Sequence, residues 1–250
     1  FELERHITPA AEPRKVVIVG GGPAGLEAAR VAALEGHAVD LYERAERVGG
    51  VLLPAATPDF KRELHRMIDW WEGQLDGLPV TIHLNHPVTA DDPALADADK
   101  VIIATGSTPL VPGSIPGIDG PNVVGVIEAH QGADLGKRVV VAGGGLSGAD
   151  LALELAQAGH EVSIVEMAND IARDMLPINR LTLLRELDKA GIAIYTGYFV
   201  TAISPEGVTT SHQGGEQILP ADSVVAAFGV RPDKSLAEEL TRRDIAFEEV

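Results

Sequence analysis

Residues 16–25 read VVIVGGGPAG, and residues 139–148, 123 positions later, read VVVAGGGLSG. Each stretch is an apolar run that enters three consecutive glycines and reaches a further glycine three positions later. The parallel continues to an acidic residue 23 positions after the first glycine, which is Glu43 in one copy and Glu166 in the other. Apolar runs of this kind indicate buried strands, and the small residues after the glycines indicate a helix. The sequence therefore predicts one strand–turn–helix–strand unit that occurs twice.

The spacing of the glycines in each copy is that of a dinucleotide-binding loop. In the first copy, Gly20 lets the chain turn out of the strand, Gly22 leaves room for a pyrophosphate, and Gly25 lets helix and strand pack closely. The N-terminus of the following helix attracts anions, and the acidic residue accepts hydrogen bonds from ribose hydroxyls. A single motif of this type also fits a plain glycine turn. Two copies in matching contexts favour a protein that holds two dinucleotides.

Composition excludes several classes of function. The 250 residues are 45% hydrophobic and carry a net charge of −17, with scattered basic residues, which disfavours nucleic acid or an anionic membrane as a partner. The sequence has no apolar stretch long enough to span a membrane and no signal-peptide pattern, so we expect a cytoplasmic protein. Cysteine is absent, which excludes disulfides and thiolate-ligated clusters within these residues. The eight histidines show no metal-ligand spacing.

Strands and helices are predicted to alternate, which is typical of a doubly wound α/β fold. A helix that starts at Pro58–Asp59 carries Phe60, Leu64, Met67, Ile68 and Trp71 at helical spacing, so we expect the pair Trp70–Trp71 to pack in the core rather than stack on a ligand. Short runs after residue 199 suggest a small antiparallel addition. The predicted strands are 15–19, 38–42, 80–84, 101–104, 139–141, 162–165, 192–195 and 224–227, and the other predicted helices are 23–34, 147–158 and 179–190.

Further motifs give the repeat a family resemblance. Ala104–Gly106 recurs in part as Ala227 and Gly229, and residues 229–232 read GVRP. With the two glycine loops, these residues resemble the flavoproteins that pair FAD with a nicotinamide nucleotide. The sequence of residues 166–184 is similar to part of the carboxyl-terminal half of old-yellow-enzyme-like reductases of the 2,4-dienoyl-CoA reductase and 2-enoate reductase type. The resemblance implies two Rossmann-like domains, the second inserted into the first, in an NAD(P)H-dependent flavin oxidoreductase.

The resemblance also predicts the division of the chain. We expect a linker over 1–14, an FAD-binding domain over 15–110, a Pro- and Gly-rich crossover over 111–121, an NAD(H)-binding domain over 122–233, and a return to the first domain over 234–250. Phe1 is not an initiator methionine, so we expect a piece of a longer protein or a processed form. The last strand of the first domain and its closing Gly-Asp are expected beyond Val250.

The resemblance assigns one set of residues to FAD. Val51 stands where the family has a glutamine, so that side-chain contact is absent. Lys61 also fits an ordinary solvated lysine, and Val88 an apolar residue at a strand edge. The expected FAD-binding residues are Gly20, Gly22, Pro23, Ala24, Gly25, Glu43, Arg44, Gly50, Val51, Lys61, Val88, Ala104, Thr105 and Gly106.

A second set is assigned to the nicotinamide nucleotide. Asp150 also fits an acidic residue in a helix first turn, where the dipole favours it. Glu166 accepts from a 2′-hydroxyl but repels a 2′-phosphate, and residues 167–169 contain no arginine or lysine, so NADH is favoured over NADPH. The expected residues are Gly143, Gly145, Leu146, Ser147, Gly148, Asp150, Glu166 and Gly229.

In the family, electrons pass from NAD(P)H to FAD and then through a 4Fe-4S cluster to FMN on an upstream β/α-barrel. The resemblance therefore implies a hydride-passing module that serves an upstream FMN and iron–sulfur domain, and we expect no catalytic side chain and no metal ligand in the chain itself. A non-catalytic nucleotide-binding scaffold and a stand-alone NADH:acceptor diaphorase are the alternatives.

Overall fold

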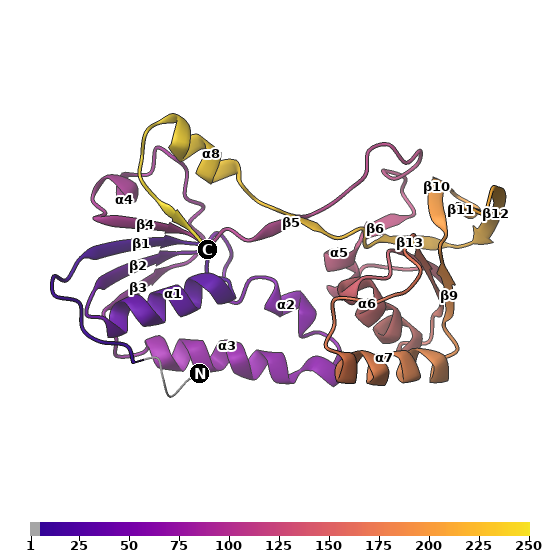
Figure 1. Ribbon diagram of the computed structural model, residues 1–250, viewed down its shortest axis with the longest axis horizontal. Helices are drawn as coiled ribbons and strands as arrows, with labels where there is room; N and C mark the ends of the chain where they lie inside the picture. Colours follow the sequence, from indigo (N-terminus) through magenta and orange to yellow (C-terminus); the bar gives the residue numbers. More distant parts are fainter. Residues whose placement is uncertain (1–5) are drawn as a thin grey trace. The chain divides into compact units, whose positions relative to one another are not determined.

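The computed structural model describes residues 6–250, which divide into two compact units. One unit contains the chain up to Ser107 and again from Pro232 to Val250, and the other contains Thr108–Arg231 (Figure 1). The second unit is therefore inserted into the first, as the sequence predicts. The stretch 111–121 lies within the second unit. The two crossings, β5 (Ser107–Pro109) and β14 (Val230–Pro232), pair as a two-stranded sheet.

The first unit is built on a parallel five-stranded sheet in the order β15-β4-β1-β2-β3. Its strands are β1 (Lys15–Val19), β2 (Ala38–Tyr42), β3 (Val80–His83), β4 (Lys100–Ile103) and β15 (Glu248–Glu249). Its helices are α1 (Pro23–Leu34), α2 (Leu52–Ala55), α3 (Glu63–Leu75), α4 (Pro93–Ala96) and α8 (Ser235–Arg242), with a 3-10 turn η1 (Asp59–Lys61).

The second unit repeats this sheet in the order β6-β13-β7-β8-β9, again all parallel. The predicted antiparallel addition is a three-stranded sheet in the order β10-β11-β12. The strands are β6 (Val123–Gly125), β7 (Arg138–Ala142), β8 (Glu161–Glu166), β9 (Ala193–Thr196), β10 (Phe199–Ser204), β11 (Gly207–His212), β12 (Gly215–Pro220) and β13 (Ser223–Ala226). The helices are α5 (Val126–His130), α6 (Leu146–Gln157) and α7 (Pro177–Lys189).

The shared strand order explains why the glycine loops lie where they do. In the first sheet the chain runs outward from β1 through β2 to β3 and then returns to place β4 on the other side of β1. In the second sheet β7, β8, β9 and β13 follow the same course. Ligands of open parallel sheets bind beyond the carboxyl ends of the strands at this point of reversal. Both glycine loops follow the strand that borders it, β1 in one unit and β7 in the other.

The central strands are apolar because both of their faces are buried. In β1, Val16 and Ile18 belong to a core cluster shared with α1 and α3, and Val17 and Val19 belong to a cluster on the other face with α4 and α8. The second sheet is covered in the same way, by its helices on one face and by the three-stranded sheet on the other. Such continuous Val- and Ile-rich strands are typical of parallel sheets.

The expectation that both tryptophans pack in the core is only half correct. Trp71 is 4% exposed and donates its ring N–H to Glu27 at 3.0 Å. Trp70 is 48% exposed, and its ring lies 5.6 Å from the guanidinium carbon of Arg30. The buried stripe of α3 follows a period of three to four residues, and position 70 falls outside it. The buried residues of this helix are Ile68, Trp71 and Leu75.

The helix also begins later than the sequence predicts, and two of its spaced apolar residues are exposed. Phe60 and Met67 are 43% and 46% exposed, and the helix begins at Glu63, after η1, rather than at Pro58. At the edge of the first sheet lies the two-residue strand β15. It pairs with Ile102 and Ile103, and Val250 N–H donates to the Ile103 carbonyl at 3.0 Å.

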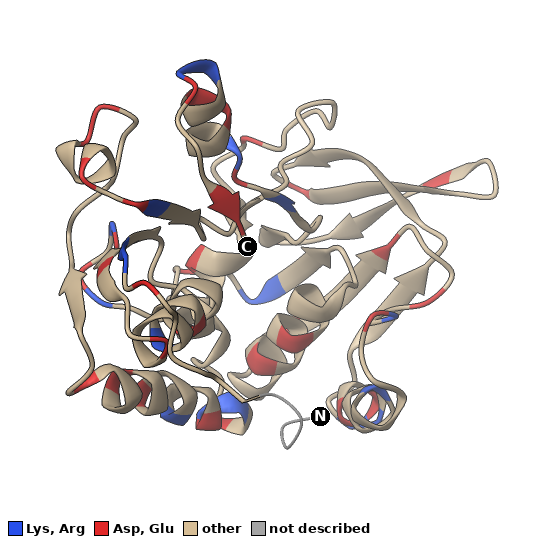
Figure 2. Ribbon diagram, turned by 60° about the vertical axis from the view of Figure 1, so that its left-hand side comes forward, with Lys and Arg blue, Asp and Glu red and all other residues tan. Residues whose placement is uncertain are grey.

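Charged side chains are spread over both units, with acidic and basic residues interspersed (Figure 2). Within residues 6–250, none of the helices has the length and apolarity that a membrane span requires. The same part of the chain contains no grouping of histidine, aspartate and glutamate that could hold a metal ion.

Candidate dinucleotide-binding sites

The first glycine of each loop is required by the strand end that passes over it. Gly20 has φ +112°, and a Cβ built there would lie 2.2 Å from the Ala104 carbonyl oxygen. Gly143 has φ +120°, and its Cβ would lie 2.1 Å from the Ala227 carbonyl oxygen. Only glycine adopts this backbone without strain at such a close approach. The recurrence of Ala104 as Ala227 thus reflects a repeated backbone contact.

The last glycine of each loop is required by the turn itself. A Cβ at Gly25 would lie 1.8 Å from the Gly20 carbonyl oxygen, and a Cβ at Gly148 would lie 2.0 Å from that of Gly143. Real Cβ atoms do not approach a carbonyl so closely. The helix therefore packs onto the turn through a surface that no side chain could occupy.

No contact within the chain requires a glycine at the start of each helix. Gly22 and Gly145 have ordinary φ values of −78° and −65°. A Cβ at Gly145 would meet no atom within 4 Å, and the nearest atom to one at Gly22 would be 3.9 Å away. The space that a side chain would fill is open in both units. A glycine there is explained by the close approach of a ligand to the backbone, so the loops fit the pyrophosphate of a dinucleotide.

The helices that follow are also suited to an anion. The first N–H groups of a helix have no partner within it, and their dipoles attract negative charge. Neither α1 nor α6 has a side-chain hydrogen bond at its N-cap or an acidic residue in its first turn. Ala24, Leu146 and Ser147 are exposed there. The N-terminal ends of both helices can therefore receive a phosphate.

The acidic residue of each repeat holds the middle glycine of its loop. Glu43 is 8% exposed and accepts hydrogen bonds from Gly21 N–H at 2.6 Å and Ala45 N–H at 2.8 Å. Glu166 is less buried and accepts from Gly144 N–H at 2.7 Å and Ala168 N–H at 2.8 Å. Each carboxylate oxygen keeps a further lone-pair site for a ribose hydroxyl.

Sequence reasoning missed the middle glycines Gly21 and Gly144 as part of the site. The signal that could have found them is the constant spacing of 22 positions from each middle glycine to the acid. That spacing brings the carboxylate of one strand end to the backbone of the neighbouring loop.

Among the remaining residues expected near FAD, Gly50 lies against the first glycine loop. Gly50 has φ +53°, and a Cβ there would lie 2.9 Å from the Gly22 Cα atom, so the two glycines pack together. Val51 follows as the N-cap of α2 and is 54% exposed. Arg44, directly after Glu43, is exposed, and Lys61 is the last residue of η1. Val88 packs against the core cluster that contains residues of α4 and α8.

The loop after β4 is fastened to the returning chain. Thr105 donates its hydroxyl to the Asp233 carbonyl at 2.9 Å, and Asp233 N–H donates to the Gly106 carbonyl at 2.9 Å. In the second unit, Leu110 N–H donates to the carbonyl of Gly229, which has φ +99°. Thr105, Gly106 and Gly229 thus hold the chain crossings in place.

Asp150 is not the first-turn acid that one interpretation of the sequence allowed. It lies in the second turn of α6 and is 5% exposed. The helix dipole acts mainly within the first turn, so it does not account for an acidic residue here.

The residues that directly follow Glu166 carry no positive charge. Met167 directly after it is 66% exposed, and Arg173, the nearest basic residue in the sequence, is exposed on the loop before α7. A 2′-phosphate would meet the carboxylate without a basic side chain from residues 167–169.

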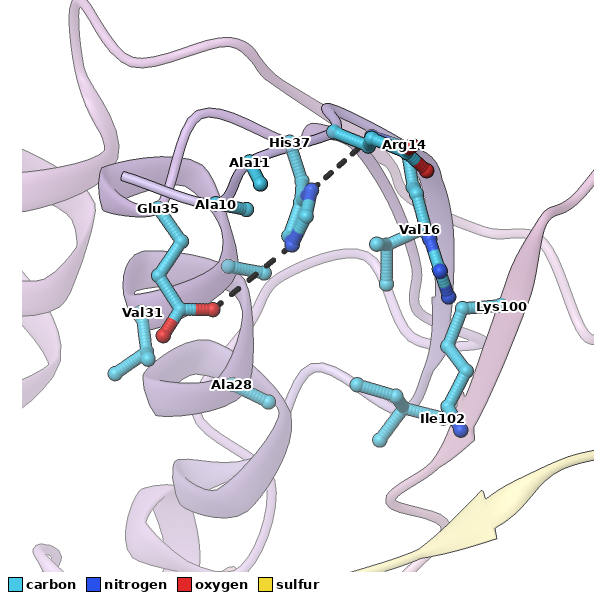
Figure 3. Close-up of a pocket in the computed structure, with 12 residues that line it drawn as sticks. Ala10, Ala11, Arg14, Val16, Ala28, Val31, Glu35, His37, Lys100 and Ile102 are labelled. Carbon is cyan, nitrogen blue, oxygen red and sulfur yellow. Dashed lines mark hydrogen bonds and ion pairs between the residues drawn. The ribbon is translucent and has the colours of Figure 1, made fainter. Parts of the chain in front are cut away.

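A cavity of about 550 Å³ in the first unit lies elsewhere and contains none of the expected site residues. Its floor is formed by α1 and by Val16 and Ile102 of the sheet (Figure 3). At its rim His37 Nδ1 accepts from Arg14 N–H at 3.1 Å, near the start of β1. Because the cavity is at the opposite end of β1 from the glycine loop, it is not the dinucleotide site.

Several known proteins share this architecture. The chain is 40% identical over 233 residues to an NADH oxidase of Thermoanaerobacter brockii, a match that covers 91% of this chain and 36% of that protein. It is 37% identical over 244 residues to a cinnamate reductase of Clostridium sporogenes, with 96% and 36% covered. The structure of 2-naphthoyl-CoA reductase with 2-naphthoyl-CoA superposes with a TM-score of 0.90 at 33% identity and covers 98% of this chain and 37% of that one.

The chain therefore spans little more than a third of the length of these relatives. The matches confirm the resemblance to the flavin-binding part of old-yellow-enzyme-like reductases. The sequence model of pyridine nucleotide-disulphide oxidoreductases matches residues 14–246. The expected cofactors, FAD and NAD(H), and the expected enzyme class, an NAD(P)H-dependent flavin oxidoreductase, are those of this family. The chain belongs to the pyridine nucleotide-disulphide oxidoreductase family.

Proposed function

We propose that this chain is an electron-input module in which the second unit binds NADH and the first unit binds the FAD that receives its electrons. The observation that carries the proposal is the open space at Gly22 and Gly145. In each unit that space lies at a helix N-terminus and at the point of reversal of a parallel sheet. Protein packing explains the neighbouring glycines but not these two, which a bound pyrophosphate does explain.

The residues of both sites have binding roles. FAD, when bound, supplies a two-electron acceptor for the hydride of NADH. The N–H groups at the start of α1 and α6 hold the pyrophosphates, and the carboxylates of Glu43 and Glu166 accept from ribose hydroxyls. Transfer between two cofactors requires orientation and exclusion of water rather than a side-chain acid or base. We therefore assign no catalytic residue.

NADH is the proposed donor because of Glu166. Replacing the carboxylate and adding a base, as in E166S/M167R, should move the preference towards NADPH. The variant M167R alone retains the repelling carboxylate and should shift it less. The ratio of kcat/KM for the two nucleotides measures the effect, and an unchanged ratio in the double variant would contradict this role of Glu166.

The acceptor of the electrons is proposed from the relatives. They are more than twice as long as this chain and include a cinnamate reductase. An FMN and 4Fe-4S β/α-barrel upstream, in the same polypeptide or in a partner, would receive the electrons and reduce an activated double bond. A cytoplasmic location is part of the same proposal.

Flavin absorbance tests the proposal. After incubation with excess FAD and removal of the free cofactor, we expect the chain to keep the visible flavin absorption band. Under anaerobic conditions NADH should bleach that band much faster than NADPH. A chain that retains FAD but is not bleached by either nucleotide would refute the electron-input role.

A second candidate is a nucleotide-holding structural unit without redox activity. Val51, which stands where the family has a glutamine, is the observation that favours it, because an exposed valine offers FAD no side-chain hydrogen bond. The absorbance experiment separates the two candidates. A chain that binds adenine nucleotides but retains no flavin would be the scaffold.

A further inference from the structure

The backbone of Gly144 is held from both sides by the segment between β8 and α7. Glu166, at the end of β8, accepts from Gly144 N–H at 2.7 Å. Six residues later, Ala172 N–H donates to the Gly144 carbonyl at 2.8 Å. Ile171 covers the same glycine, since a Cβ at Gly144 would lie 2.5 Å from an Ile171 methyl carbon. The orientation of the two peptide groups around Gly144 therefore depends on this segment.

The turn that brings Ala172 to Gly144 is not favourable by itself. Ala172 has φ +49°, in the left-handed region that residues other than glycine rarely adopt. The first unit makes the same contact, because Gly49 N–H donates to the Gly21 carbonyl at 2.8 Å, but there a glycine occupies the turn at φ +125°. The second unit has an alanine at this point and needs support from outside the turn.

Arg180, in the first turns of α7, supplies that support. Its Nε donates to the Ile171 carbonyl at 3.0 Å, directly before the strained residue. Its terminal nitrogen bonds the Asp170 carboxylate, which in turn accepts from Ile171 N–H at 2.9 Å. The Arg180 side chain is 24% exposed, and Ile171 and Ala172 are 2% and 1% exposed. The partly exposed guanidinium thus binds one side of the turn. The other side of the turn contacts the glycine loop.

We propose that Arg180 is a positioning residue for the pyridine nucleotide. By holding Ile171 and Asp170 it fixes Ala172 against Gly144, and this contact sets the direction of the N–H groups at Gly145 and beyond. Its Nε and one terminal nitrogen bond Ile171 and Asp170, so the role assigned to it is to hold the turn rather than to contact the nucleotide. This role rests on the proposed function of the second unit, and it adds to the nucleotide site a residue that lies outside the glycine loop.

The test uses the chain loaded with FAD, so that an added nucleotide meets only the second site. ADP-ribose, which has the adenosine and pyrophosphate but no reactive ring, is titrated calorimetrically into wild type, R180M and R180K. Methionine keeps a helix-compatible side chain of similar length without the donors. R185M is the matched control, because Arg185 is an exposed arginine on the same helix.

We expect R180M to weaken ADP-ribose binding by about tenfold, the usual effect of losing one charged hydrogen bond. R180K, which keeps a donor for the Ile171 carbonyl, should recover part of that loss, and R185M should bind as wild type. In steady state R180M should raise the KM for NADH and leave kcat unchanged. FAD affinity, a property of the first unit, should be the same in all four proteins.

The outcomes separate this inference from the function on which it rests. A wild-type chain that fails to bind ADP-ribose contradicts the proposed function, and the role of Arg180 fails with it. Wild-type affinity in R180M, alongside a functional second site, overturns the role of Arg180 alone. Equal loss of FAD and ADP-ribose binding in R180M would also overturn it, because it would indicate general unfolding.

Discussion

Substituting single glycines of the second loop separates those that the fold requires from the one that the ligand requires. G148A introduces a Cβ 2.0 Å from the Gly143 carbonyl oxygen, which is backbone and cannot rotate away. Overpacking of this kind costs about 3 kcal/mol, and the higher helix propensity of alanine returns about 1 kcal/mol. We expect G148A to lower the free energy of unfolding by about 2 kcal/mol.

G145A should behave in the opposite way. Its Cβ meets no atom within 4 Å, and φ is already −65°, so alanine fits without strain. Because alanine is a poorer N-cap residue than glycine, we expect the free energy of unfolding to fall by about 1 kcal/mol or less. The same methyl group would stand where the pyrophosphate has to approach the backbone. Loss of even one charged hydrogen bond of about 2 kcal/mol lowers affinity more than tenfold.

Urea denaturation gives the two stabilities, and calorimetric titration of the FAD-loaded chain with ADP-ribose gives the affinities. We expect G145A to be stable and deficient in binding, and G148A to be destabilised. If G145A bound ADP-ribose as tightly as wild type, or lost as much stability as G148A, the interpretation of the open space as a ligand cradle would be wrong.

Three further outcomes are expected. V51Q should tighten FAD binding by about threefold or more by adding a side-chain hydrogen bond, as measured by flavin fluorescence; equal affinity would show that position 51 does not contact the cofactor. W71F should lower the free energy of unfolding, measured in urea, by about 2 kcal/mol, because it removes the hydrogen bond to Glu27 and part of the buried ring volume. W70F should change the free energy of unfolding little. Equal effects of the two substitutions would contradict the assigned burial. The Arg30 hydrogen bond lowers the pKa of Glu27 below its usual value of 4.5, against the opposing effect of burial, and the Trp71 bond lowers it further. Because the pKa of Glu27 is lower in the folded state, its ionisation stabilises the fold above pH 4.5, and this stabilisation is lost as the pH falls through the folded pKa. E27Q should therefore make the urea midpoint depend less on pH over that range. An unaltered pH profile would refute the linkage.

The repeated units could be predicted from sequence because several physical constraints coincide in them. The runs before Gly20 and Gly143 are apolar because both sheet faces are buried, and the first and last glycines of each loop are fixed by backbone contacts that recur in both units. These are local patterns, and a single sequence displays them directly.

Other features depend on contacts that a sequence does not display. The periodicity of α3 could not distinguish Trp70 from Trp71, because adjacent positions differ by only 100° around a helix and the direction of the core is set by the sheet. The acid of each repeat was predicted as a ribose ligand, but its bond to the middle glycine depends on how one strand end faces the next loop. The left-handed alanine at position 172 has no sequence signal comparable to a glycine. The assignment of individual residues to FAD or NADH stays a prediction.

A crystal structure of the chain with FAD and NADH tests the central claim most directly. We expect the pyrophosphate of FAD against the N–H groups that follow Gly22 and the pyrophosphate of NADH against those that follow Gly145, with Glu43 and Glu166 each within hydrogen-bond distance of a ribose. Nucleotides bound away from both glycine loops, or loops closed by side chains in the presence of saturating cofactors, would contradict it.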